Sequence, residues 1–181
     1  MQSLRLPIRT MVVVHAVVLC AIAASAQQQL RVQQRWTEFR SPEHGFAAVF
    51  PGTPEVKTQH NAAVASYIYE VDASDQSTFS VLVLEYASDS GTRLSDNDLN
   101  QLIDAYTKDG TRILRRSATR IDGHNAIEAV LDIVPLSDSV GLVDIMNYGN
   151  RVYLMLCVGP KAIEPSADLL RFRDSFHLLG K

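Results

Sequence analysis

The sequence is short of cysteine and of residues that break regular structure. Its 181 residues include two cysteines, nine glycines and seven prolines. Two cysteines are too few for a disulfide scaffold or for a four-ligand zinc site of the common kind. So few glycines and prolines exclude a collagenous or low-complexity chain. Because 46% of the residues are hydrophobic, the chain is also not wholly disordered, and its length predicts one domain with its own core.

An excess of basic charge is also missing, and so are the common catalytic signatures. Lys and Arg number 17 against 20 Asp and Glu, which argues against electrostatic binding of nucleic acid. The sequence contains no Gly-x-Ser-x-Gly elbow, no phosphate-binding Walker loop and no dinucleotide fingerprint. Its histidines are not spaced as a metal-binding pair. We therefore expect neither a cofactor nor a metal.

The first 26 residues have the anatomy of a secretory signal peptide. Arg5 and Arg9 precede an apolar run over residues 11–24, and small residues at 24–26 suit a signal peptidase. The run is shorter than the roughly 20 residues that span a membrane comfortably, so we predict cleavage after Ala26, with an uncleaved anchor as the alternative. The protein is then periplasmic or secreted, and a bacterial envelope fits best.

Cleavage after Ala26 would change the net charge and the cysteine content of the chain. Two basic and no acidic residues leave with the signal peptide, so 15 basic and 20 acidic groups remain, a charge of −5. No membrane-spanning segment remains either. Cys157 becomes the only cysteine, which excludes an internal disulfide. It lies in an apolar run, which predicts an inert buried thiol.

Residues 27–35 are polar and without a clear period, which predicts a flexible lead-in to a single domain over 36–181. Hydrophobic periodicity and turn residues then predict eight strands and two helices. The first helix begins at Ser95, with Asp98 in the capping-box position, and the second begins at Pro165 or Ser166. The strands are expected over residues 36–40, 46–50, 63–72, 78–87, 112–121, 125–134, 140–148 and 151–158. Consecutive antiparallel strands interrupted by one helix and closed by another indicate an α+β fold.

Two short motifs resemble those of exported bacterial PsbP-like domains. Residues 39–46 (FRSPEHGF) and 50–54 (FPGTP) look like the opening of that family. Residues 172–176 (FRDSF) resemble the helix that ends many of its members. The resemblance implies an α/β/α sandwich around an antiparallel sheet, a fold shared with photosystem II extrinsic subunits and a Ran-binding import factor. It implies no set of catalytic residues.

The strand over residues 112–121 carries the most distinct charge feature. A regular strand would place Arg112, Arg116 and Arg120 on one face and Arg115 on the other. Such a stripe is a candidate site for an anionic ligand or an acidic partner. The alternative is a solvated edge strand, on which charges discourage pairing between sheets.

Three functions follow from these features. The first is a non-catalytic binding or accessory module that contacts an envelope protein or a small ligand. The second is a hydrolase with an unrecognised site near Asp122 and His124, although the Asp122-Gly123 hairpin turn already explains the position of these residues. The third is a structural component of an envelope assembly. The sequence leans away from catalysis and leaves the oligomeric state open.

Overall fold

The computed structural model describes residues 35–60, 64–73, 76–87, 94–105, 107, 111–133, 136, 138–161 and 166–180. The predicted signal peptide and residues 27–34 of the predicted lead-in lie outside this part of the chain. The end of the first predicted helix, beyond Thr107, lies outside it as well.

Within the described residues, ten strands and two helices follow one another along the chain. Their bounds, in chain order, are β1 Thr37–Ser41, β2 Phe46–Phe50, β3 Glu55–His60, β4 Val64–Asp72, β5 Thr78–Tyr86, α2 Asp96–Asp104, β6 Arg112–Ile121, β7 His124–Asp132, β8 Ser139–Tyr148, β9 Arg151–Pro160, α3 Ala167–Ser175 and β10 His177–Leu178. Strands β3 and β10 were not predicted from the sequence.

The strands form two antiparallel sheets. The larger has seven strands in the order β3-β4-β5-β9-β8-β7-β6, and the smaller has three in the order β1-β2-β10. Two tight hairpins, at Asp122-Gly123 and Gly149-Asn150, join β6 to β7 and β8 to β9, as the sequence predicts. The fold is therefore α+β with largely antiparallel sheets, and the predicted fold class is confirmed.

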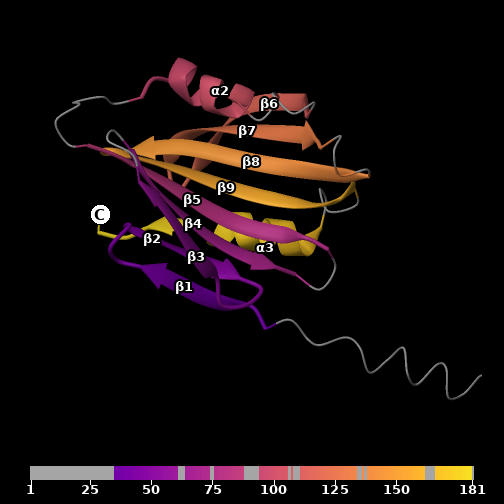
Figure 1. Cartoon of the computed structure of the whole chain (residues 1–181), viewed down its shortest axis with the longest axis horizontal. Coiled ribbons are helices and arrows are strands. Elements are labelled where there is room, and N and C mark those ends of the chain that lie inside the picture. Colours follow the sequence, from indigo (N-terminus) through magenta and orange to yellow (C-terminus); the bar gives the residue numbers. More distant parts are fainter. Residues whose placement is uncertain are drawn as a thin grey trace, which may run out of the picture. The chain divides into compact units, whose positions relative to one another are not determined.

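The two helices lie on opposite faces of the large sheet (Figure 1). We call these the α2 face and the α3 face. On the α3 face, α3 and the small sheet together cover a core rich in aromatic side chains, in which Phe172 contacts Phe50 and Phe79 at ring-centroid distances of 5.3 and 5.4 Å. On the α2 face, Leu99 and Ile103 of α2 pack on β7, β8 and β9. Alternate residues of each central strand point to these two cores.

Both helices begin at the predicted caps. At α2, the Ser95 hydroxyl accepts a hydrogen bond from the Asp98 N–H, and the Asp98 carboxylate accepts one from the Ser95 N–H at 2.8 Å. At α3, the Ser166 hydroxyl accepts a hydrogen bond from the Leu169 N–H. Each cap satisfies backbone donors that the first turn of a helix leaves without partners.

Candidate functional site

The predicted arginine stripe is divided between the two faces of the large sheet. A β-bulge between Ile113 and Arg115 shifts the register of β6 against β7. Arg112 consequently lies opposite Asp132, on the α3 face together with Arg115. Arg116 and Arg120 lie on the α2 face. The prediction that Arg112 shares a face with Arg116 and Arg120 is therefore wrong, because one extra residue in a strand reverses the side-chain alternation.

Three of these four arginines pair with carboxylates of the chain. Arg112 contacts Asp132, and Arg115 contacts Glu128 at 3.2 Å, in both cases across to β7. Arg116 pairs with Asp104 of α2 at 2.5 Å and also donates a hydrogen bond to the side chain of Asn100 at 2.9 Å. These three arginines therefore join neighbouring elements of the fold.

Arg120 differs from the other three, since it forms no ion pair with any described residue. Its guanidinium makes one long contact, 3.4 Å, to the carbonyl of Gly123. It lines an open groove of about 410 Å³ together with Asp96 at the start of α2 and Asn125 at the start of β7. The remaining lining residues are Ala118, Thr119, Ala126 and Ile127. We call this the Arg120 groove.

The Arg120 groove brings a cation, a carboxylate and an amide to one open surface. Among the described residues, neither the carboxylate of Asp96 nor the amide of Asn125 forms a side-chain hydrogen bond or ion pair. Pockets that bind small molecules combine an apolar lining with a few polar groups, and the groove has that composition. Sequence reasoning found Arg120 but missed Asp96 and Asn125, because only the tertiary fold brings the start of α2 next to the β6–β7 hairpin.

The alternative catalytic pair, Asp122 and His124, lies at the hairpin turn between β6 and β7. Asp122 adopts φ of +49° in the turn, and its carboxylate accepts a hydrogen bond from the backbone N–H of Leu178 at 2.9 Å. The ring of His124 lies edge-on to the ring of Tyr148, with centroids 5.0 Å apart. Asp122 thus ties β10 to the turn, and His124 packs across the hairpins. Cys157 lies in the core of the α3 face, 1% exposed, as a buried thiol should.

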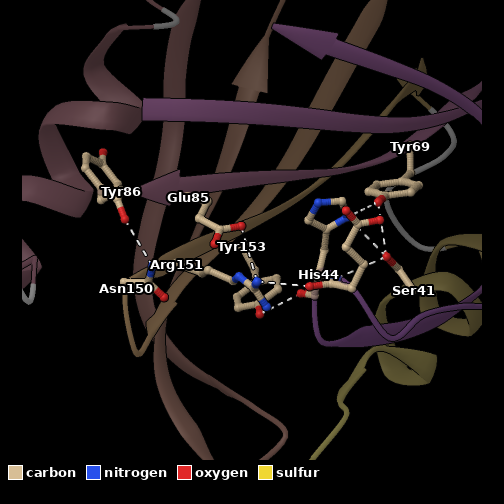
Figure 2. A network of polar contacts seen from close by, with 9 residues as sticks. Ser41, His44, Tyr69, Glu85, Tyr86, Asn150, Arg151 and Tyr153 are labelled. Atoms are coloured by element: carbon tan, nitrogen blue, oxygen red, sulfur yellow. Dashed lines mark hydrogen bonds and ion pairs between the residues drawn. The ribbon is translucent and has the colours of Figure 1, made fainter. Parts of the chain in front are cut away.

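A buried polar network surrounds the loop between β1 and β2 (Figure 2). Ser41 and His44 come from the end of β1 and from this loop, and both meet the hydroxyl of Tyr69 on β4. Tyr69 OH is hydrogen-bonded to His44 Nδ1 and lies 3.1 Å from Ser41 Oγ. On the other side of the loop, Tyr153 of β9 donates a hydrogen bond to the His44 carbonyl at 2.9 Å.

Arg151 completes the attachment of this loop to the large sheet. Its guanidinium donates to the carbonyl of Glu43 at 2.9 Å and pairs with Glu85 of β5 at 3.2 Å (Figure 2). Gly45 has φ of +71°, and a Cβ at this position would lie 3.1 Å from Arg151 Nη1. The residues of the SPEHGF motif therefore hold the loop on strands β4 and β9, and Arg151 of β9 is in turn paired with Glu85 of β5.

The groups around His44 are of the kinds found in catalytic sites, but they are buried. Burial lowers the pKa of His44, with Arg151 acting in the same direction, so the imidazole is neutral at pH 7. Burial also raises the pKa of Tyr69. Ser41, His44 and Tyr69 are 6%, 5% and 3% exposed, so the three side chains are largely shielded from solvent. The network instead satisfies polar groups that the loop brings into the interior.

A second buried polar cluster anchors α3. Arg173 pairs with Glu128 of β7 at 2.6 Å and with Asp144 of β8 at 3.0 Å. It also donates a hydrogen bond to the hydroxyl of Thr119 at 3.2 Å. Glu128 and Asp144 lie directly opposite each other on neighbouring strands. Burial raises the pKa of Asp144 to about 6, although Arg173 opposes this shift. The cluster fastens α3 to the sheet through a single guanidinium.

The described residues include no group of three or more His, Cys, Asp or Glu arranged to hold a metal ion. None of the described helices has both the length and the apolar character needed to cross a membrane.

Two helices lie on opposite faces of a seven-stranded antiparallel sheet, and a small sheet lies beside the second helix. This arrangement is that of a PsbP-like α+β domain. The solved structures include one with a similar arrangement, the solution structure of cyanobacterial PsbP (CyanoP) from Synechocystis sp. PCC 6803. The TM-score is 0.55, and the match covers 82% of this chain and 95% of the other at 12% sequence identity. No protein-family model and no curated protein matches the sequence. The predicted PsbP-like fold is confirmed, and export of the chain stays a prediction.

Proposed function

We propose that the protein is an exported, non-catalytic accessory module that binds a ligand or partner through the Arg120 groove. The observation that carries this proposal is the set of three polar side chains in the groove. Arg120, Asp96 and Asn125 form no ion pair or hydrogen bond with another described side chain. Elsewhere on β6, each arginine already has a carboxylate partner.

The buried polar clusters support a non-catalytic role. The groups around His44 hold the β1–β2 loop, and the groups around Arg173 hold α3. Each of these clusters has a role in the fold, and the groups His44 and Asp144 within them are buried. The PsbP-like fold supports an accessory role as well, because the resemblance includes extrinsic subunits that act within larger assemblies.

The predicted signal peptide over residues 1–26 supports a periplasmic or secreted location. Expression with the native N-terminus in a bacterium tests this part of the proposal. We expect the purified periplasmic protein to begin at Gln27, as intact mass and N-terminal sequencing would show. Retention of residues 1–26 on the membrane-bound protein would support the anchor alternative and contradict cleavage.

Binding to the Arg120 groove is tested by nuclear magnetic resonance. Labelled protein is titrated with a panel of small carboxylic acids, amino acids and short peptides. We expect a member of the panel to shift the amide signals of residues 118–120 and 125–127, and we expect Arg120→Ala to abolish these shifts. Arg40→Ala is the matched control, since Arg40 is an exposed arginine of the small sheet that pairs with Glu38. Shifts that persist in Arg120→Ala, or that map away from the groove, would contradict the proposal.

A further inference from the structure

Strand β6 forms one edge of the seven-stranded sheet, and no strand of the described residues pairs with its outer side. It is hydrogen-bonded to β7 alone. No described residue outside β7 forms a hydrogen bond with the backbone of residues 116–121. Along such an edge, alternate residues direct their N–H and C=O groups outward, where an extended segment can pair with them.

The bulge limits where pairing can occur. The register of β6 is irregular between Ile113 and Arg115, and Leu114 at the bulge is 59% exposed. A bulge bends a strand and interrupts its ladder, so the first part of β6 is unsuited to receive another strand. From Arg116 to Ile121 the register with β7 is regular. This six-residue stretch is long enough for a short strand, and it includes the residues of β6 that line the Arg120 groove.

The charges of β6 determine what kind of strand fits. The strand contains four arginines and no acidic residue. A second copy of β6 would place arginines against arginines, and like charges on neighbouring strands are destabilising. An acidic segment would instead place carboxylates beside Arg120, which has no ion pair among the described residues. Charge complementarity therefore favours an acidic partner over a second copy of the chain.

We propose that residues 116–121 of β6 accept an extended acidic segment of a partner protein by strand addition. This inference rests on the proposed function, since the Arg120 groove would hold the side chains that the added strand turns toward the α2 face. On that face Ala118 lies between Arg116 and Arg120, and Arg116 is already neutralised by Asp104. In an added strand of alternating acidic and apolar residues, the acidic side chains would share the α2 face, with one of them beside Arg120, and the apolar side chains would lie on the α3 face beside Ser117 and Thr119.

Three fluorescent hexapeptides test this proposal with the whole protein. The first alternates glutamate and valine, the second replaces glutamate with lysine, and the third is the first peptide with alternate backbone amides N-methylated. We expect the first to bind at least about tenfold more tightly than the second, because of its charge, and than the third, because N-methylation removes the backbone donors of the ladder. Arg120→Glu should weaken binding of the first peptide about tenfold, and Arg40→Glu should leave it unchanged.

The outcomes separate this inference from the proposed function. If the N-methylated peptide binds as tightly as the first and still shifts the groove amides, strand addition is overturned while ligand binding by the groove stands. If the lysine peptide binds as well as the glutamate peptide, the acidic character of the partner is overturned. If the groove amides fail to respond to these peptides and to the small-molecule panel alike, both the inference and the proposed function are overturned.

Discussion

The described residues cover the two faces of the seven-stranded sheet to different extents. The α3 face is sealed by α3 and the small sheet, and Phe46, Phe50, Phe79 and Phe172 are each at most 2% exposed. On the α2 face, one nine-residue helix packs mainly on β7 and β8. Leu82 and Leu84 of β5 and Leu156 of β9 are only partly buried on this face. Leu82 and Leu84 line a hollow of about 230 Å³ together with Leu102, Ala105 and Leu154.

We infer from this difference that the α3 face mainly supports stability and that the α2 face leaves surface for recognition. The sealed face buries the large aromatic side chains, and burial of apolar area is the main favourable term in folding. The open face contributes less to folding and leaves surface available to other molecules, including the Arg120 groove. We therefore expect substitutions on the α3 face to affect the free energy of unfolding, and substitutions at the groove to affect binding.

The largest predicted effect is on the α3 face. Phe172→Ala should lower the free energy of unfolding by about 3–5 kcal/mol, because it leaves a cavity between α3, Phe50 and Phe79. Leu84→Ala is the matched change on the α2 face, and we expect a loss of about 1 kcal/mol because Leu84 is already partly exposed. Urea unfolding monitored by circular dichroism measures both. Equal losses would show that the two faces contribute alike and would contradict the comparison.

The second prediction concerns the buried carboxylate of the α3 face. The pKa of Asp144 is raised from 3.8 to about 6, so between these values the folded protein keeps a proton that the unfolded chain has lost. The stability that Asp144 contributes is therefore present below about pH 4 and is lost as the pH rises through 6. The loss is at most about 3 kcal/mol, since one pKa unit corresponds to about 1.4 kcal/mol.

Asp144→Asn tests this sign. The variant should lack this fall in stability between pH 4 and 7, so the wild type should lose up to about 3 kcal/mol more than the variant over that range. Asp138→Asn, at a carboxylate whose side chain is 94% exposed, serves as the control and should follow the wild type. Urea unfolding at a series of pH values measures the difference. A wild-type stability that rises over this range relative to Asp144→Asn would contradict the assigned pKa direction.

Local patterns in the sequence were sufficient to predict most of the fold. Strands β2 and β6 have the predicted bounds, and both helix caps form where serine precedes the first turn. Strand β3 was missed because all six of its residues are exposed at a sheet edge, so they show no apolar alternation. Strand β10 was missed because its two residues are held by pairing with β2, far away in the sequence.

The candidate site was less accessible to sequence reasoning. A bulge leaves no mark in a single sequence, so the faces of Arg112 and Arg116 were assigned from regular alternation, which the structure does not follow. The proximity of Asp96 to Arg120 depends on how α2 packs on the sheet. Asp144 did have a signal, since it is the only charged residue of β8 and lies between apolar neighbours. An isolated charge in an apolar strand indicates a buried carboxylate that needs a partner.

The smallest predicted effect tests how the β1–β2 loop closes the α3 face. Gly45 and Gly149 both have positive φ, +71° and +62°, so an alanine at either position would be strained by about 1 kcal/mol. A Cβ at Gly149 would meet nothing within 4 Å, whereas one at Gly45 would also press on Arg151 and on the Tyr153 hydroxyl. Gly45→Ala should therefore cost about 1 kcal/mol more than Gly149→Ala in urea unfolding, because it also disturbs the buried network. If the two variants lose the same free energy, the loop is not seated tightly against β9, and the α3 face is less well sealed than its buried aromatic side chains indicate.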